Sequence, residues 1–374
     1  MVRRLYFRLY LALVPFLSVI GIPLSAFRIV DGLAFLSYFL MASLLLDIVL
    51  VLLYLKRVSV KTVYIAVLLL IPPLIIGLLF NDISRRQLTD FLLPLLFFLK
   101  IVIFRHYFYT NNISKFLIDY TRITVIGALF LAPLVYIIFN LFGGTRISIL
   151  APLEVGAAFF LFRNPALFIL ILGLVIFYGK RAQLVAILTS VLLSMNLLKG
   201  RQRALLFLSL PIVFSLGLTF ALTNPDNISV KRITNSVDLV VEGDYSRLSS
   251  GRFDEINAIM GEMSFLDYIF GKGNGYVYEL RDPQGETLKV ANSHFTPLAL
   301  LSKYGVFFTV FFYLYIFKAI TGVRKAANKH RKILYVSTLI FIFQSFFSYA
   351  IFVLPIIPVL IGGLVSYKVN RGVY

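Results

Sequence analysis

Long apolar runs separated by short polar stretches set the pattern of this chain. The runs are about 15 to 22 residues long and continuously apolar, and a helix of that length crosses a hydrocarbon core about 30 Å thick. They lack the ten-residue alternation of β-barrel strands, and a helix satisfies its own backbone hydrogen bonds inside lipid. The pattern therefore predicts an all-α polytopic membrane protein.

About twelve runs predict about twelve transmembrane helices, in three parts. Residues 1–222 contain the first nine, residues 223–296 form one long loop, and residues 297–374 contain the last three. The predicted spans are 9–27, 32–55, 62–80, 91–104, 119–140, 148–162, 165–178, 182–198, 204–222, 297–317, 333–352 and 354–367.

Composition reinforces the contrast between the runs and the loop. Hydrophobic residues make up 60% of the chain and charged residues 14%, and the mean hydropathy is +0.91. Yet 11 of the 17 acidic residues lie between Thr223 and Ser293. A membrane chain with so much of its negative charge in one segment keeps that segment outside the bilayer.

Basic residues predict the orientation. With the amino terminus inside, 22 of them lie at cytoplasmic ends and 7 at the opposite short ends, as the positive-inside rule requires. Both termini are therefore predicted to be cytoplasmic and the loop external. The formal net charge of +19 is explained by this bias and by attraction to anionic lipid head groups, so no nucleic-acid partner is expected.

Cysteine and histidine usage limits the chemistry. The chain has no cysteine and three histidines, which excludes disulfides, thiolate catalysis and cysteine-ligated metal. Two of those histidines fall on the predicted cytoplasmic side, so a zinc-like cluster is not expected. We predict neither a metal nor a cofactor, with carboxylate-bound magnesium as the one alternative left open.

The second half of the loop predicts a helix. Phe253, Ile256, Ile259, Met260 and Met263 recur at three- and four-residue spacing and make an apolar stripe, which predicts an amphipathic helix lying over the bundle or in the membrane interface. Arg252 begins this helix. Taken alone it favours a solvated or ion-paired surface arginine over a ligand-binding one.

Two further features follow that helix. Residues 270–276 contain three glycines at alternate positions, which predict a tight turn; anion binding by its backbone is the alternative, because the spacing is not that of a P-loop. His294 stands where the chain re-enters the membrane. It is a candidate base or hydrogen-bond donor, and a polar anchor is the alternative.

Basic residues are sparse on the predicted external side, so those present are expected to have a role other than setting the orientation. Arginine suits bidentate binding of phosphate because it is planar and always charged. If Arg181 and Arg252 converge with Arg146 or Arg86, they form a pocket for a diphosphate at head-group depth. The alternative is that each arginine reaches lipid phosphate independently.

In these features the chain resembles the O-antigen polymerase and ligase superfamily, the Wzy-type polymerases and WaaL-type ligases. Residues 179–182 stand where that family has a Ser-Arg element, with Lys180 replacing the serine. Residues 251–263 and 271–275 resemble its Gly-Arg, helix and glycine turn, and residues 294–305 resemble its closing His-Asn element, with phenylalanine in place of asparagine. The topology is similar over the whole chain, the motifs only between about 179 and 305.

The resemblance implies a glycosyltransferase of GT-C-like architecture in the bacterial inner membrane, with a periplasmic active site. Its substrates would be an undecaprenyl-diphosphate-linked oligosaccharide donor and a sugar hydroxyl of an acceptor, in contact with membrane lipids; a chain-length regulator is a candidate partner. Arg181 and Arg252 would bind the diphosphate with Arg146 or Arg86 as helpers, because positive groups stabilise a leaving anion. His294, or Glu154 in its place, would be the base.

Polymerisation of O-antigen or related repeat units is the first functional prediction, and two alternatives stay open. One is a ligase that joins the glycan to lipid A-core. The other is a flippase of the same pathway; such transporters carry ionisable residues near the bilayer midplane, and Asp47 is the only residue of that kind deep inside a run.

Overall fold

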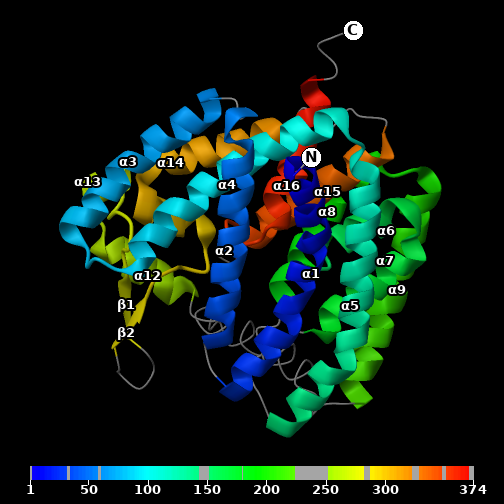
Figure 1. The fold of residues 1–374 in the computed structure, drawn as a ribbon. Coiled ribbons are helices and arrows are strands. Elements are labelled where there is room, and N and C mark those ends of the chain that lie inside the picture. Colours follow the sequence, from blue (N-terminus) through cyan, green and yellow to red (C-terminus); the bar gives the residue numbers. More distant parts are fainter. Residues whose placement is uncertain are drawn as a thin grey trace.

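The computed structural model describes residues 2–31, 34–57, 60–142, 151–178, 180–223, 252–281, 287–321, 328–347 and 351–369. Within these ranges the chain is almost entirely helical, and Figure 1 shows the helices packed around one another with a single small hairpin at one side. The fold is that of an all-α membrane protein, as predicted.

The helices coincide in order and place with the apolar runs. Those before the polar loop are α1 (Val2–Asp31), α2 (Ala34–Tyr54), η1 (Leu55–Arg57), α3 (Val60–Phe80), α4 (Arg85–Thr110), α5 (Ile113–Phe142), α6 (Glu154–Arg163), α7 (Pro165–Phe177), α8 (Arg181–Leu193), η2 (Met195–Leu197) and α9 (Gly200–Thr223). Those in and after it are α12 (Arg252–Glu262), α13 (Phe265–Phe270), α14 (Thr296–Thr321), α15 (Lys329–Ser345) and α16 (Ile356–Val369).

Length separates these helices into two groups. Among the described residues, five stretches are long and apolar enough to cross a membrane: Arg3–Pro23, Val63–Phe80, Arg85–Tyr109, Ile113–Ile137 and Thr296–Thr321. Other apolar stretches of the described residues are shorter: Met41–Tyr54 within α2, Pro165–Phe177, Arg181–Leu193 and Ile356–Ser366. At 1.5 Å per residue the thirteen-residue α7 is roughly 20 Å long, less than a hydrocarbon core.

The break between α6 and α7 has a local cause. Asn164 follows the last residue of α6, and its side chain accepts a hydrogen bond from the Ala166 N–H at 3.2 Å. Pro165 occupies the first position of α7, where a missing N–H costs nothing. An asparagine cap followed by proline ends one helix and begins the next.

The packing of α4 against α16 forms the centre of the bundle. Phe97, Phe98 and Phe104 of α4 are fully buried. A Cβ atom at Gly362 of α16 would lie 2.6 Å from the Phe104 Cβ and 2.9 Å from the Ile101 carbonyl oxygen. Glycine therefore lets the two backbones approach closely, which is how membrane helices gain packing energy without a hydrophobic driving force.

Asp47, the acidic residue deep inside an apolar run, is a contact within the bundle. Lys100 of α4 forms an ion pair with it, and the Tyr10 hydroxyl of α1 donates a second hydrogen bond. Buried charge is tolerated when it is paired and hydrogen-bonded. The trio therefore ties α1, α2 and α4 together.

The described part of the polar loop packs at one side of the bundle. Figure 1 shows α12, α13 and the antiparallel hairpin β1 (Tyr278–Arg281) and β2 (Thr287–Val290) beside α3 and α14. The predicted amphipathic helix is present as α12. Its stripe is divided, however: Ile259 and Met263 are buried against the hairpin and the start of α14, whereas Phe253 and Met260 are about half exposed.

Candidate functional site

Several helix ends meet at one place in the structure. Glu154 is the first residue of α6, Arg181 the first of α8 and Arg252 the first of α12, while α15 ends at Ser345. Helix α15 packs against both α6 and α8. Three helix N-termini, each with unsatisfied N–H groups and partial positive charge, therefore surround the end of α15.

The end of α15 connects the predicted site residues. Phe347 accepts a hydrogen bond on its carbonyl oxygen from Arg252 Nη2 at 3.3 Å, and its ring centre lies 5.7 Å from the guanidinium carbon. The Phe346 ring packs on Phe295, with 5.9 Å between centroids. Phe295, the residue after His294, therefore has a packing role, and it holds the re-entry segment against α15.

Arg181 and Arg252 lie close enough for their charges to repel each other. Burial lowers the pKa of Arg252, nearby Glu255 opposes that effect, and the charge of Arg181 lowers the pKa further. Two arginines held together in this way generate a positive potential that attracts an anion. The two residues are near enough for this electrostatic effect, and the diphosphate pocket stays a prediction.

His294 forms a histidine–carboxylate pair with Glu255, a residue that the sequence had suggested only as a helix-start acid. His294 Nδ1 lies 2.6 Å from Glu255 Oε1, and its backbone N–H donates to Oε2 at 2.9 Å. The Ser293 hydroxyl donates to the same oxygen at 3.1 Å. The imidazole is 60% exposed and the carboxylate 7%, so Nε2 is the ring nitrogen left to meet a substrate.

The environment of Glu255 keeps it ionised. Burial acts to raise the pKa of this carboxyl, but the hydrogen bonds from the His294 ring and backbone and from Ser293, with the charge of His294, hold the pKa below its ordinary value. An ionised partner fixes the imidazole orientation and stabilises the imidazolium form. The pair therefore has the arrangement of a general base with its orienting carboxylate.

The sequence carries one signal for Glu255. It stands four residues before Ile259 and hence on the inward face of α12, where an acid without a partner would be costly. An acidic residue on an otherwise buried stripe indicates a buried partner.

Glu154 lies deeper than the arginines and is 4% exposed. Side-chain hydrogen bonds join it to Gln183 of α8 and Gln344 of α15, and the charge of Lys180 acts on it. Lys180 is therefore near enough for its charge to act on this buried carboxylate. Glu154 is connected to the site through both α8 and α15.

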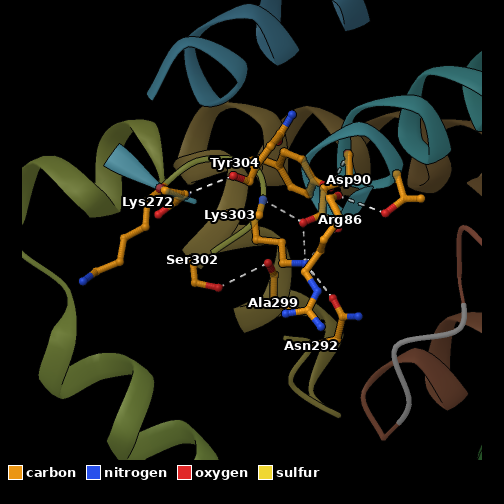
Figure 2. Close-up of polar contacts among 12 residues, drawn as sticks. Arg86, Asp90, Lys272, Asn292, Ala299, Ser302, Lys303 and Tyr304 are labelled. Atoms are coloured by element: carbon orange, nitrogen blue, oxygen red, sulfur yellow. Dashed lines mark hydrogen bonds and ion pairs between the residues drawn. The ribbon is translucent and has the colours of Figure 1, made fainter. Parts of the chain in front are cut away.

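Arg86, a predicted helper, lies in a different cluster. It is exposed, and its charge acts on Lys303, but it is not among the charges that shift Arg252. Figure 2 shows it beside Asn292 and Lys303. Arg146 falls in 143–150, outside the described residues, so its role stays a prediction.

Lys303 is one of the seven basic residues that the sequence places at external helix ends, and in the structure it is buried. Its Nζ lies 2.9 Å from each carboxylate oxygen of Asp90 and 2.6 Å from Asn292 Oδ1. The Tyr304 hydroxyl donates to the Asp90 carbonyl oxygen at 2.6 Å. This cluster joins α4, α14 and the re-entry segment (Figure 2).

The glycine-rich segment is a docked turn, as predicted. Gly271, Gly273 and Gly275 all have positive φ, and a Cβ atom on Gly273 would lie 2.3 Å from the Gly77 nitrogen. The backbone N–H groups of residues 271–276 donate, in order, to the carbonyl oxygens of Asp267, Ser302, Lys303 and Pro73, to Asp90 Oδ2 and to the Gly273 carbonyl oxygen. These donors are therefore used within the protein, which excludes the anion-binding alternative.

Comparison with protein-family models, with curated proteins and with solved structures gives no match for this chain. The class of this protein is therefore defined by its fold and its site alone. The chain is an all-α membrane protein in which an arginine pair and a histidine–carboxylate pair meet at the end of one helix.

Proposed function

We propose that this protein is a glycosyltransferase that polymerises lipid-linked oligosaccharide repeat units of O-antigen or a related surface polysaccharide. The observation that carries the proposal is the meeting of Arg181, Arg252 and the His294–Glu255 pair at the end of α15. A repelling arginine pair suits a doubly charged leaving group, and a histidine–carboxylate pair suits an alcohol nucleophile. The membrane fold suits a substrate with a lipid tail.

In the proposed reaction the acceptor hydroxyl oxygen bonds to the anomeric carbon of the donor sugar. The bond from that carbon to the diphosphate oxygen breaks, and its electron pair leaves with undecaprenyl diphosphate. The hydroxyl proton passes to His294 Nε2, while Glu255 stabilises the resulting imidazolium. Arg181 and Arg252 face the charge that grows on the leaving group, where preorganised cations give their largest effect.

The proposed topology has about twelve spans, a GT-C-like arrangement, both termini in the cytoplasm and the site at the periplasmic face of the bacterial inner membrane. The structure offers a coherent grouping in support. Arg163, Lys199 and Lys329, all assigned to the cytoplasm by the positive-inside rule, lie close enough together for their charges to interact. The externally assigned Arg181 and Arg252 form a separate group.

The topology has a direct test because the chain has no cysteine. A single cysteine at Met260 of α12 should react with a membrane-impermeant maleimide in cells with a permeabilised outer membrane. A single cysteine at exposed Lys199 should react only after the inner membrane is opened. The reverse pattern would invert the proposed orientation and refute a periplasmic site.

Elongation of a lipid-linked repeat unit by the purified protein in liposomes tests the activity itself. The wild type should produce a ladder of longer glycans without any other enzyme, which a flippase would not do. In cells, loss of the gene should leave lipopolysaccharide capped with a single repeat unit. Core without any cap would identify a ligase and refute polymerisation.

The flippase alternative depended on Asp47, and the structure gives this residue a role in helix packing. Asp47 is paired with Lys100 and Tyr10 between three helices, and a buried ion pair of this kind holds helices together. Transport by ionisable midplane residues therefore has no support from Asp47.

A further inference from the structure

Three buried polar side chains lie together near the start of α8. Glu154, Gln183 and Gln344 are 4%, 2% and 7% exposed, and they come from α6, α8 and α15. Such groups are rarely buried together unless they satisfy one another or hold a ligand. This cluster, the Glu154 cluster, is only partly self-satisfied.

The hydrogen bonds within the Glu154 cluster do not use all of its acceptor atoms. Both glutamine side chains hydrogen-bond to Glu154, and Gln183 Nε2 also donates to the Ala151 carbonyl oxygen at 2.8 Å. These contacts use the amide N–H groups. Among the described residues, the Oε1 atoms of Gln183 and Gln344 are buried without a hydrogen-bond partner, so two amide oxygens next to a carboxylate are available to accept hydrogen bonds.

That donor requirement defines the ligand chemistry. A phosphate brings only acceptors, which a carboxylate and two amide oxygens would repel. A metal ion is disfavoured because the cluster holds one carboxylate and Lys180 acts on it with a positive charge. Neighbouring hydroxyl groups supply O–H donors to oxygen acceptors, and a sugar ring carries several within a few ångströms. The cluster therefore complements the arginine pair and does not duplicate it.

The chain connects the two places directly. Lys180 and Arg181 precede Gln183 at the start of α8, and Gln344 stands three residues before Phe347, whose carbonyl oxygen binds Arg252. We infer that the Glu154 cluster binds hydroxyl groups of the donor glycan whose diphosphate is held by Arg181 and Arg252. The inference rests on the proposed function and names the part of the substrate that this second site takes.

Binding of two different lipids tests the two sites separately. One is undecaprenyl diphosphate, and the other is the lipid-linked glycan extracted from membranes of a strain that lacks this protein. Binding of each would be measured in nanodiscs to wild type and to Gln183→Met and Gln344→Met, which keep the side-chain length and remove the amide. Each variant should bind the lipid-linked glycan about tenfold more weakly, because a buried sugar hydroxyl loses its acceptor, with undecaprenyl diphosphate bound as by wild type.

Gln202 of α9, which contacts the other end of α6, provides a matched control. Gln202 donates to the Phe162 carbonyl oxygen at 3.1 Å, and Gln202→Met should bind both lipids as wild type does. If a methionine variant fails to fold, Gln344→Asn shortens the side chain and keeps the amide, and it should show the same selective loss.

The outcomes are distinct. Equal affinity of wild type and variants for the lipid-linked glycan would overturn the inference and assign the two amide oxygens to buried water. An equal loss for both lipids would overturn it as well, since the cluster would then support only the arginines. If wild type binds neither lipid, the proposed function itself fails, and the inference fails with it.

Discussion

Two clusters of positive charge in this protein are built in opposite ways. Lys303 is buried, and its ammonium group contacts both oxygens of Asp90 and Asn292. Arg252 is partly exposed, and the charge of Arg181 acts against it. The first cation is paired directly with a carboxylate, whereas the second lies near the Glu255 carboxylate and also near a second cation, Arg181. The comparison indicates that the Lys303 cluster supports the fold, whereas the Arg181–Arg252 cluster is the one for which we propose a negatively charged ligand.

The largest effect is expected from breaking the neutralised cluster. Asp90→Ala leaves the Lys303 ammonium buried without its partner and also removes the acceptor of the Gly275 N–H. Loss of one member of a buried ion pair costs about 3–5 kcal/mol, so folded protein in detergent should fall sharply and activity should fall with it. Thermal unfolding followed by circular dichroism measures this.

The double variant Asp90→Asn with Lys303→Met removes both charges and serves as the control. It should recover most of the stability, because the cost lies in the unpaired charge. Wild-type stability of Asp90→Ala combined with lost activity would place Lys303 in the site and end the distinction between the two clusters.

The next effect concerns the histidine–carboxylate pair beside Arg252. His294→Ala should lower the elongation rate by about 10²- to 10⁴-fold, the range for loss of a general base, with little change in stability because the ring is 60% exposed. Glu255→Gln keeps a hydrogen-bond acceptor for the ring and removes the charge, so its loss should be smaller, and the pH–rate profile should shift. Full activity of His294→Ala would reject the base assignment and turn attention to Glu154.

A smaller effect is expected from pH. The pKa of Glu255 in the folded protein is below its ordinary value, so its stabilising contribution is present above about pH 4.3, the ordinary value for glutamate. That contribution is lost as the pH falls through the lowered pKa. The chain has no tryptophan, so Phe253→Trp on the half-exposed face of α12 gives a single fluorescent reporter of its docking.

With that reporter, acidification should loosen α12 in wild type but not further in Glu255→Gln, which lacks the titrating group. At neutral pH the Glu255→Gln variant should unfold roughly 2 °C lower, the shift expected from about 1 kcal/mol in a protein of this size. An identical acid response in both proteins would assign the loosening to another group.

Helix positions could be predicted from the sequence because they depend on local pattern. Each apolar run became a helix, and the three- and four-residue spacing located α12. What the spacing could not decide is which side of the stripe is covered. Phe253 and Met260 belong to the same pattern as Ile259 but remain half exposed, because the hairpin and the start of α14 cover only part of the helix.

Only the site residues that stand out by their charge and their position in the chain could be predicted from the sequence. Arg181, Arg252 and His294 were predicted as cations and a base at loop edges. Glu255 was missed because its contact with His294 joins residues 39 apart, and burial of Lys303 was missed because Asp90 lies 213 residues away. Contacts of that range depend on the tertiary fold, which local pattern does not contain.

Equilibrium binding of undecaprenyl diphosphate in nanodiscs measures whether the arginine pair binds a diphosphate. Arg163 is the matched control, since it also lies over a phenylalanine ring, 4.6 Å from the centroid of Phe159. Arg181→Ala and Arg252→Ala should each weaken binding about tenfold or more, the loss expected for a charge-assisted contact, and Arg163→Ala should leave it unchanged. Equal affinity in all three variants and wild type would contradict the account.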